Sequence, residues 1–73
     1  MDKRNIIGEN VRKLRKEQNL TQEELTAKLQ LKGLDIDRPM LTKIELRKRE
    51  VLDFELLCIA EVFNVSTEEL FKK

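Results

Sequence analysis

The residues with the clearest chemical potential lie between Asp37 and Arg49, a segment that reads DRPMLTKIELRKR. Five of its thirteen residues are basic and two are acidic, although the whole chain balances 15 basic against 14 acidic residues. The basic residues are Arg38, Lys43, Arg47, Lys48 and Arg49. Ammonium and guanidinium groups form charge-assisted hydrogen bonds with anions. A nearly neutral chain that gathers its positive charge in one segment is expected to present that segment to a polyanion.

Other kinds of chemistry find little support in the sequence. The chain has no histidine, so general acid–base catalysis lacks its commonest group and a Cys/His zinc site is excluded. Gly8 and Gly33 stand alone and form no phosphate-binding loop. Paired glutamates at residues 23–24 and 68–69 each fall in a predicted first helical turn, where they complement the helix dipole. We therefore expect no enzyme, no cofactor and no metal site.

Length and composition predict one small domain over residues 1–73, because 40% apolar residues are enough to form a core. The single cysteine, Cys58, cannot form an intramolecular disulfide and is expected to be a small buried hydrophobe. The first ten residues, MDKRNIIGEN, lack the apolar run that a signal peptide would have, and nowhere do about 18 apolar residues follow one another, so we expect neither a signal peptide nor a membrane span. The expected compartment is therefore the cytoplasm.

Few glycines, prolines and β-branched runs, together with abundant Leu, Glu, Lys and Arg, predict an all-α fold. Four helix starts share one pattern, in which a capping residue lies between an apolar residue and another apolar residue four positions after the cap. The caps are Thr21, Asp37, Asp53 and Ser66, with Glu24 and Glu69 completing capping boxes at the first and last of them. Leu52 and Leu57 are expected to form the staple around Asp53.

A further helix is predicted from about residue 5 to residue 18, where Ile7, Val11 and Leu14 form a buried stripe. Gly33 followed by Leu34 predicts a left-handed stop at the end of the second helix. Five helices joined by short connections result.

The third predicted helix separates its apolar and polar residues. At 100° per residue, Leu41 and Ile44 form the inner face, with Met40 at its margin and Glu45 on its border. The outward residues are Arg38, Pro39, Thr42, Lys43 and Leu46. Residues 1–16 and 38–49 each carry a net charge of +4, whereas residues 50–71 carry −6. The molecule is therefore expected to be electrostatically polarised.

The order of these segments resembles a known family. LTQEELTAKL, an amphipathic helix ending in KIE, a basic RKR and then DFELLCIAEVFNVSTEELF are similar to the phage-repressor type of helix-turn-helix. This is the Cro and lambda-repressor class, also called Xre-like, and the resemblance covers about residues 6–71. It implies a compact five-helix DNA-binding domain, with the helix-turn-helix at about residues 21–47 and the third helix in the major groove. It also implies a sequence-specific transcriptional regulator, most simply a repressor of bacterial or phage origin.

The resemblance assigns roles by position. Residues expected to read base edges are Arg38, Pro39, Thr42 and Lys43. Residues expected to contact phosphate are Gln22, at a helix N-terminus, and Lys48 and Arg49 after the third helix, with Arg47 added because it lies next to them. Arg15 and Glu45 flank the apolar stripes of their helices, at positions where the family commonly pairs an arginine with a glutamate. The chain departs from the family pattern at Leu46-Arg47, where Asn-Gly is usual, and in a longer connection between the motif helices.

Two functions remain open on this sequence. One short recognition helix contacts few base pairs, so we expect a homodimer through the fourth and fifth helices and a roughly palindromic operator. The alternative is a protein-interaction module of the same fold, either an antitoxin or an antagonist of another regulator. A second apolar stripe on the fourth helix, formed by Phe54, Cys58 and Val62, fits either a subunit interface or a helix packed on all sides.

Overall fold

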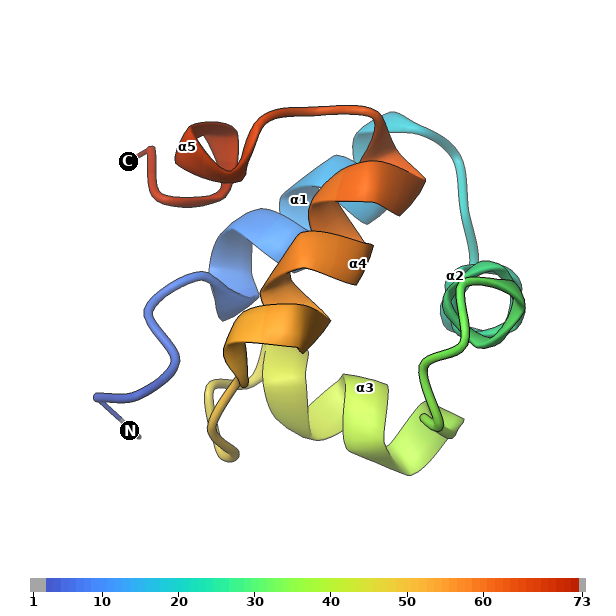
Figure 1. The fold of residues 1–73 in the computed structure, drawn as a ribbon, viewed down its shortest axis with the longest axis horizontal. Helices are drawn as coiled ribbons and strands as arrows, with labels where there is room; N and C mark the ends of the chain where they lie inside the picture. Colours follow the sequence, from blue (N-terminus) through green and yellow to red (C-terminus); the bar gives the residue numbers. More distant parts are fainter. Residues whose placement is uncertain (1–2, 73) are drawn as a thin grey trace.

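The computed structural model describes residues 3–72, which contain five helices and no strand (Figure 1). The helices are α1 (Gly8–Glu17), α2 (Gln22–Leu31), α3 (Arg38–Glu45), α4 (Asp53–Phe63) and α5 (Thr67–Leu70). The predicted all-α fold of five helices is confirmed. In the described part of the chain, no helix is both long enough and apolar enough to cross a membrane.

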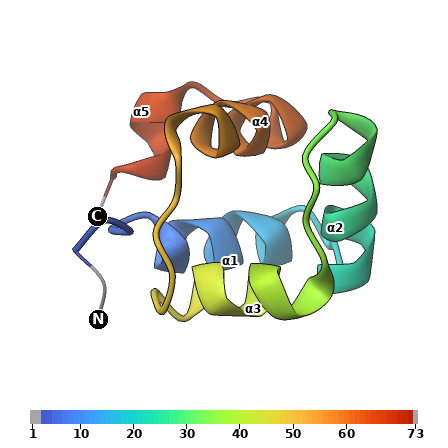
Figure 2. The same cartoon turned by 60° about the horizontal axis from the view of Figure 1, so that its bottom comes forward.

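The helices pack around one core. Helix α4 contacts α1, α2 and α5, whereas α3 contacts α1 and α2. Figure 2 shows α3 at the edge of the molecule, with α1 between it and α4, so that one side of α3 is left uncovered. The buried apolar residues are Ile7, Val11, Leu25, Leu29, Leu34, Ile36, Leu41, Ile44, Ile59, Ala60, Phe63 and Leu70.

Two of the predicted helix starts carry the expected cap. The Thr21 hydroxyl accepts the backbone N–H of Glu24 at 3.0 Å, and the Glu24 carboxylate accepts the backbone N–H of Thr21 at 2.9 Å. This reciprocal pair is a capping box. At the start of α3, the Asp37 carboxylate accepts the backbone N–H of Met40 at 2.9 Å. Helices α2 and α3 therefore begin at the predicted residues.

The predicted cap at Asp53 is wrong. Helix α4 begins one residue earlier than expected, with Leu52 at the cap position and Asp53 as the first helical residue. The Glu55 carboxylate satisfies the backbone N–H of Leu52 at 2.9 Å. Leu52 and Leu57 are both exposed, so the expected staple between them does not form.

Ser66 occupies the predicted cap position of α5, but its side chain makes no capping hydrogen bond. The expected capping box with Glu69 is therefore wrong. The Glu69 carboxylate instead accepts the ammonium group of Lys72 at 2.7 Å. Helix α5 is a single turn of 4 residues, and Lys72 lies just beyond its end.

Helix α1 begins at Gly8, three residues after the predicted start, because Asn5 has a different role. The buried Asn5 side chain, 1% exposed, accepts the Gly8 N–H at 3.0 Å and donates to the carbonyls of Ile44 and Arg49 at 2.9 and 3.0 Å. A Cβ atom at Gly8 would lie 2.1 Å from the Ile44 carbonyl oxygen. The absence of a side chain at Gly8 therefore permits the close contact between the start of α1 and the end of α3.

The predicted stop at Gly33 is confirmed. Gly33 has a φ of 89°, and its N–H donates to the Gln30 carbonyl at 2.9 Å. The Leu34 N–H donates to the Leu29 carbonyl at 3.1 Å, and both leucines are buried. These are the two hydrogen bonds and the apolar pair of a Schellman motif.

Helix α3 ends by the same geometry on a residue with a side chain. Arg47 has a φ of 58°, its N–H donates to Ile44, and the Lys48 N–H donates to Lys43 at 2.8 Å. A left-handed conformation is unfavourable for a residue with a Cβ atom and is usually taken by glycine or asparagine. Leu46-Arg47 therefore ends α3 where the family's Asn-Gly would, at some cost in backbone strain.

Candidate nucleic-acid interface

The outward face of α3 carries the residues that were predicted to lie on it. Leu41 and Ile44 are completely buried against the core. On the opposite side, Arg38, Pro39, Lys43 and Leu46 are exposed and Thr42 is partly exposed. The separation follows from the 3.6-residue period, since residues on this side point away from the stripe that packs on α1 and α2. The face carries a cation in its first turn, Arg38, and a second one further along, Lys43, and it ends on the apolar Leu46.

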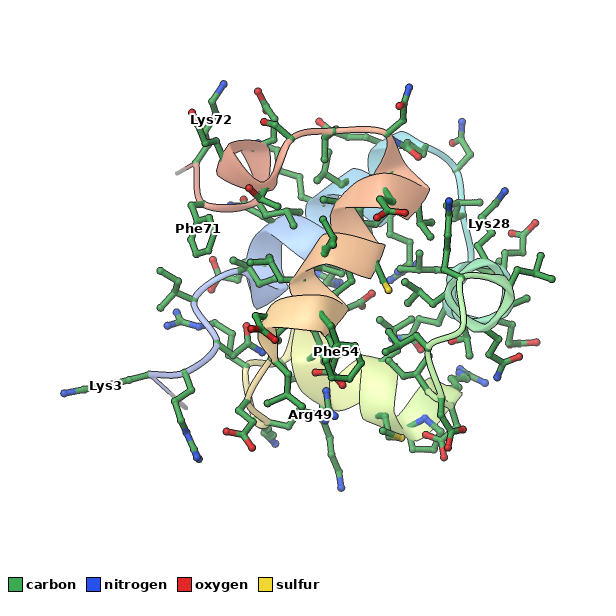
Figure 3. The ribbon with its side chains drawn as sticks, viewed as in Figure 1. Lys3, Lys28, Arg49, Phe54, Phe71 and Lys72 are labelled. Atoms are coloured by element: carbon green, nitrogen blue, oxygen red, sulfur yellow. The ribbon has the colours of Figure 1, made fainter. Side chains whose placement is uncertain are left out.

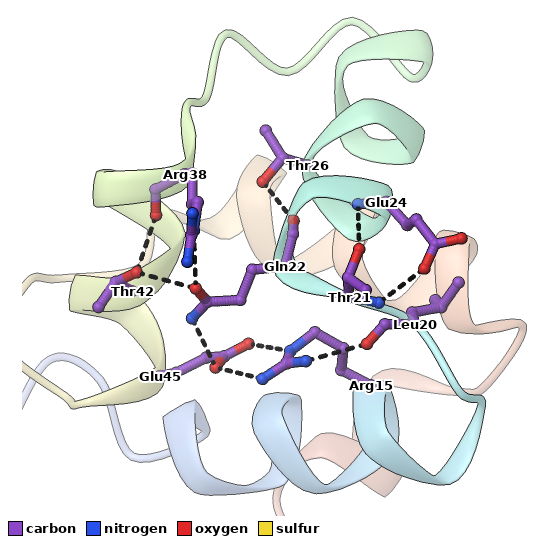
Figure 4. Close-up of polar contacts among 9 residues, drawn as sticks. All are labelled: Arg15, Leu20, Thr21, Gln22, Glu24, Thr26, Arg38, Thr42 and Glu45. Carbon is purple, nitrogen blue, oxygen red and sulfur yellow. Dashed lines mark hydrogen bonds and ion pairs between the residues drawn. The ribbon is translucent and has the colours of Figure 1, made fainter.

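Gln22, the first residue of α2, links this face to the rest of the domain (Figure 4). Its side-chain carbonyl accepts the Arg38 Nε–H at 3.2 Å and the Thr42 hydroxyl at 3.3 Å. Its amide nitrogen donates to Glu45 Oε1 at 3.2 Å. Both atoms of the amide have a partner, and one of its two N–H donors stays free within residues 3–72, so α2 holds two outward residues of α3 in place and keeps one donor for a further contact.

The ion pair expected between Arg15 and Glu45 is present in the structure (Figure 4). Arg15 Nε lies 2.7 Å from Glu45 Oε2, and Nη2 lies 3.1 Å from Oε1. The remaining terminal nitrogen of Arg15 donates to the Leu20 carbonyl at 2.9 Å. The two side chains are only 11% and 3% exposed, so each charge is compensated by the other in a largely dry site.

The start of α2 holds an anionic residue in its charged form. The pKa of Glu24 lies below its ordinary value, first because its carboxylate accepts the backbone N–H of Thr21 and then because of the Thr21 hydroxyl. Beside it, Glu23 forms an exposed ion pair with Arg38, with 3.4 Å between Oε1 and Nη1. The N-terminal turn of α2 therefore places one carboxylate, that of Glu23, against the cationic face of α3.

The three basic residues after α3 have different surroundings. Lys48 is exposed, and in residues 3–72 its side chain takes part in neither a hydrogen bond nor an ion pair. Arg47 Nε donates to the backbone carbonyl of Asn5 at 2.8 Å, and within residues 3–72 its terminal nitrogens take part in no further hydrogen bond or ion pair. Arg49 makes a bidentate pair with Glu55, at 3.2 and 3.1 Å, in which the side chains are 23% and 6% exposed. Lys48 is therefore the most available of the three, and Arg49 is occupied within the fold.

A comparison with known protein families identifies the family of this chain. A family model described as helix-turn-helix matches residues 11–70, which include most of α1 and all of α2 to α5. The chain belongs to the helix-turn-helix family. Its group is the Xre, or lambda-repressor-like, type, as the sequence resemblance indicated, and this is a family of DNA-binding regulators. No match to the chain was found among curated proteins or among solved structures.

Three residues of this helix-turn-helix domain make contacts at the site that the sequence analysis did not predict. Asn5 holds the exit of α3, Glu23 pairs with Arg38, and Glu55 both caps α4 and pairs with Arg49. For Glu55 a signal was present, because it lies three residues after Leu52 in the position of a capping-box glutamate. For Asn5 and Glu23 no local pattern predicts a partner, since both partners come from α3 or the loop after it.

Away from α3, the helix-turn-helix domain exposes apolar residues on its C-terminal helices. Phe54 and Leu57 of α4 are each 53% exposed, and Phe71 after α5 is 48% exposed. Figure 3 shows Phe54 at the start of α4 and Phe71 beyond the end of α5. Cys58 and Val62, the other members of the predicted second stripe, are partly buried against the core. Among residues 3–72, no cluster of three or more Cys, Asp or Glu residues is placed to hold a metal ion.

Proposed function

We propose that this protein is a sequence-specific transcriptional regulator, most simply a repressor, of bacterial or phage origin, acting in the cytoplasm. In this proposal α3 enters the DNA major groove while α2 crosses the phosphate backbone, so that residues 21–47 act as the helix-turn-helix. The observation that carries it is the uncovered face of α3, where Arg38 is 61% exposed and the Gln22 amide holds its Nε. The helix-turn-helix family match supports the same conclusion.

The base-reading residues in this proposal are Arg38, Pro39, Thr42 and Lys43. Arg38 and Lys43 donate to guanine O6 and N7, and Thr42 meets a thymine methyl group or a phosphate. Pro39 limits how closely the first turn of α3 approaches the base edges. Because Arg38 uses one nitrogen on Gln22 and one on Glu23, it retains further N–H donors for DNA.

The phosphate contacts in this proposal come from Gln22, Arg47, Lys48 and Arg49. Lys48 contributes most, because its ammonium group has no competing acceptor within residues 3–72. Arg47 keeps its terminal nitrogens for phosphate while its Nε is held by Asn5. Arg49 contributes least, because both its terminal nitrogens already lie on Glu55.

We further propose a homodimer through α4 and α5 that binds a roughly palindromic operator. The 8 residues of α3 contact too few base pairs to select one site at physiological salt, whereas two half-sites about one helical turn apart suffice. The exposed side chains of Phe54, Leu57 and Phe71 support a contact on these helices. Analytical sedimentation at rising protein concentration measures dimer formation. Leu57→Glu, on the proposed interface, should weaken the dimer, whereas the control Leu31→Glu should not.

Selection of bound sequences from a random DNA pool tests the proposed function. Success is a recurrent, roughly palindromic sequence that the protein binds at least about 1000-fold more tightly than scrambled DNA. A pool that yields no preferred sequence contradicts the proposal.

The same exposed apolar residues of α4 favour a second candidate, a protein-interaction module that acts as an antitoxin or as an antagonist of another regulator. The two functions differ in the response of DNA binding to sequence. An interaction module retains random and selected DNA equally, whereas a regulator discriminates between them.

A further inference from the structure

One apolar side chain lies at the C-terminal end of the proposed DNA-facing face of α3. Leu46 is the residue that closes α3, and it is 52% exposed. On the helix it falls opposite Leu41 and Ile44, the two residues that are fully buried. A lone exposed leucine on a protein surface needs no explanation, but this one shares its face with Lys43 and Arg38.

The surroundings of Leu46 are charged. Together with Glu9, Arg12, Glu45 and Arg47 it lines an open groove of about 540 Å³ between α1 and the end of α3. Directly after it come Arg47, Lys48 and Arg49. Glu45 is already paired with Arg15, and Arg49 with Glu55. A partner that covers Leu46 therefore meets the cations Arg12, Arg47 and Lys48 and one further carboxylate, Glu9, which fits a polyanion better than an apolar protein surface.

The major groove offers one apolar group on its base edges, the 5-methyl group of thymine. The other groups there are donors and acceptors, and a leucine pressed against them would leave them without hydrogen bonds. We propose that Leu46 is a specificity-determining residue that contacts a thymine 5-methyl group in each half-site. This inference rests on the proposed function, since it requires α3 to lie in the major groove.

The geometry also places that thymine. Leu46 lies eight residues after Arg38, which corresponds to about 12 Å along the helix at the usual rise per residue. If α3 runs along the groove, this corresponds to three to four base pairs at about 3.4 Å per base pair. The selected thymine is therefore expected about three to four base pairs from the position that Arg38 reads.

The test replaces thymine by deoxyuridine, which removes only the methyl group. Each thymine of the selected operator is replaced singly, and binding isotherms are measured for the wild type, Leu46→Ala and Leu31→Ala. Leu31 is the matched control, because it is 88% exposed and lies at the end of α2. Circular dichroism verifies that Leu46→Ala folds, and Leu46→Asn replaces it if it does not. Leu46→Met keeps an apolar side chain and serves as the conservative variant.

We expect one thymine per half-site at which deoxyuridine weakens wild-type and Leu31→Ala binding about fourfold, the effect of removing one buried methyl group. Leu46→Met keeps this sensitivity. Leu46→Ala binds the two DNAs equally, and 5-methylcytosine at that position restores wild-type binding relative to cytosine.

Two results overturn the inference. One is an operator in which no deoxyuridine replacement affects the wild type. The other is a methyl effect of equal size in the wild type and Leu46→Ala. A wild type that selects no DNA sequence at all refutes the proposed function instead, so the two failures are distinguishable.

Discussion

Arg38, at the start of α3, donates its Nε–H to the side-chain carbonyl of Gln22, at the start of α2, over 3.2 Å. The same glutamine donates to Glu45, which is paired with Arg15 of α1. The outward face of α3 is therefore connected through one amide to a buried ion pair, and the position of Arg38 depends on residues of three helices. Changes in this network are expected to affect stability and DNA binding to different extents.

Replacing Glu45 with Ala should lower the free energy of unfolding by about 3 kcal/mol. The change leaves the Arg15 guanidinium, whose side chain is only 11% exposed, without its carboxylate partner. Glu61→Ala is the control, because Glu61 is 48% exposed and lies 3.5 Å from Lys32. That change should cost less than about 1 kcal/mol. Thermal unfolding of both variants measures the difference, and equal melting temperatures would contradict the importance of the Arg15–Glu45 pair.

Replacing Arg38 with Ala should weaken binding to the selected operator by about 1–3 kcal/mol and relax the preference at one base position. Replacing Lys48 with Ala should weaken binding to all sequences alike and lower the salt dependence by about one unit of slope. The difference arises because Arg38 lies on the outward face of α3, whereas Lys48 lies beyond its end. Isotherms on cognate and scrambled DNA at several salt concentrations separate the two roles. Equal losses on both DNAs for Arg38→Ala would exclude base reading by that residue.

Replacing Glu23 with Gln should raise the affinity for scrambled DNA by about two- to fivefold at low salt. The variant releases Arg38 from an exposed ion pair and removes a negative charge near the phosphates, and the gain fades as salt rises. Affinity for the cognate operator should rise less, so the ratio of the two affinities falls. Glu68→Gln on α5 controls for the change in net charge. Weaker binding by Glu23→Gln would instead show that the pair positions Arg38 for reading.

The capping box of α2 should make stability depend on pH. Because the pKa of Glu24 is lower in the folded protein, its contribution is fully present above the ordinary pKa of a glutamate. The contribution is lost as pH falls through the lowered value. Glu24→Gln should therefore melt below the wild type at neutral pH and together with it once the pH is below the lowered pKa of Glu24. Glu17→Gln, at the C-terminal end of α1, is the control and should show no such convergence. A difference in melting temperature between Glu24→Gln and the wild type that does not change with pH would contradict the explanation.

Local patterns predicted most of the fold. The caps at Thr21 and Asp37, the stop at Gly33 and the buried pair Leu41 and Ile44 depend on residues close together in the sequence. Their hydrogen bonds span three to five positions, so composition and spacing are sufficient to place them. The uncovered face of α3 follows directly, because the period of the helix decides which residues oppose the core.

Two helix starts were predicted wrongly, for different reasons. Aspartate is a preferred cap, so the cap of α4 was predicted at Asp53, whereas the Glu55 carboxylate satisfies the Leu52 N–H three residues before it and also pairs with Arg49. That pair also occupies an arginine whose position in a basic run predicted a phosphate contact. Asn5 was assigned to a helix because its three hydrogen bonds, two of them to residues 39 and 44 positions away, have no local signature.

The contacts of Asn5 also bear on how the protein can be handled in the laboratory. The segment before α1 is hydrogen-bonded to the loop that follows α3, since the Asn5 side chain donates to the Arg49 carbonyl and the Arg4 carbonyl accepts the Val51 N–H at 3.3 Å. Truncation through Asn5, or a bulky fusion placed close to it, would loosen the neighbourhood of Lys48 and reduce DNA affinity without touching α3. Amide hydrogen exchange at Val51 would report such loosening directly, so its protection is a useful quality check on any tagged preparation.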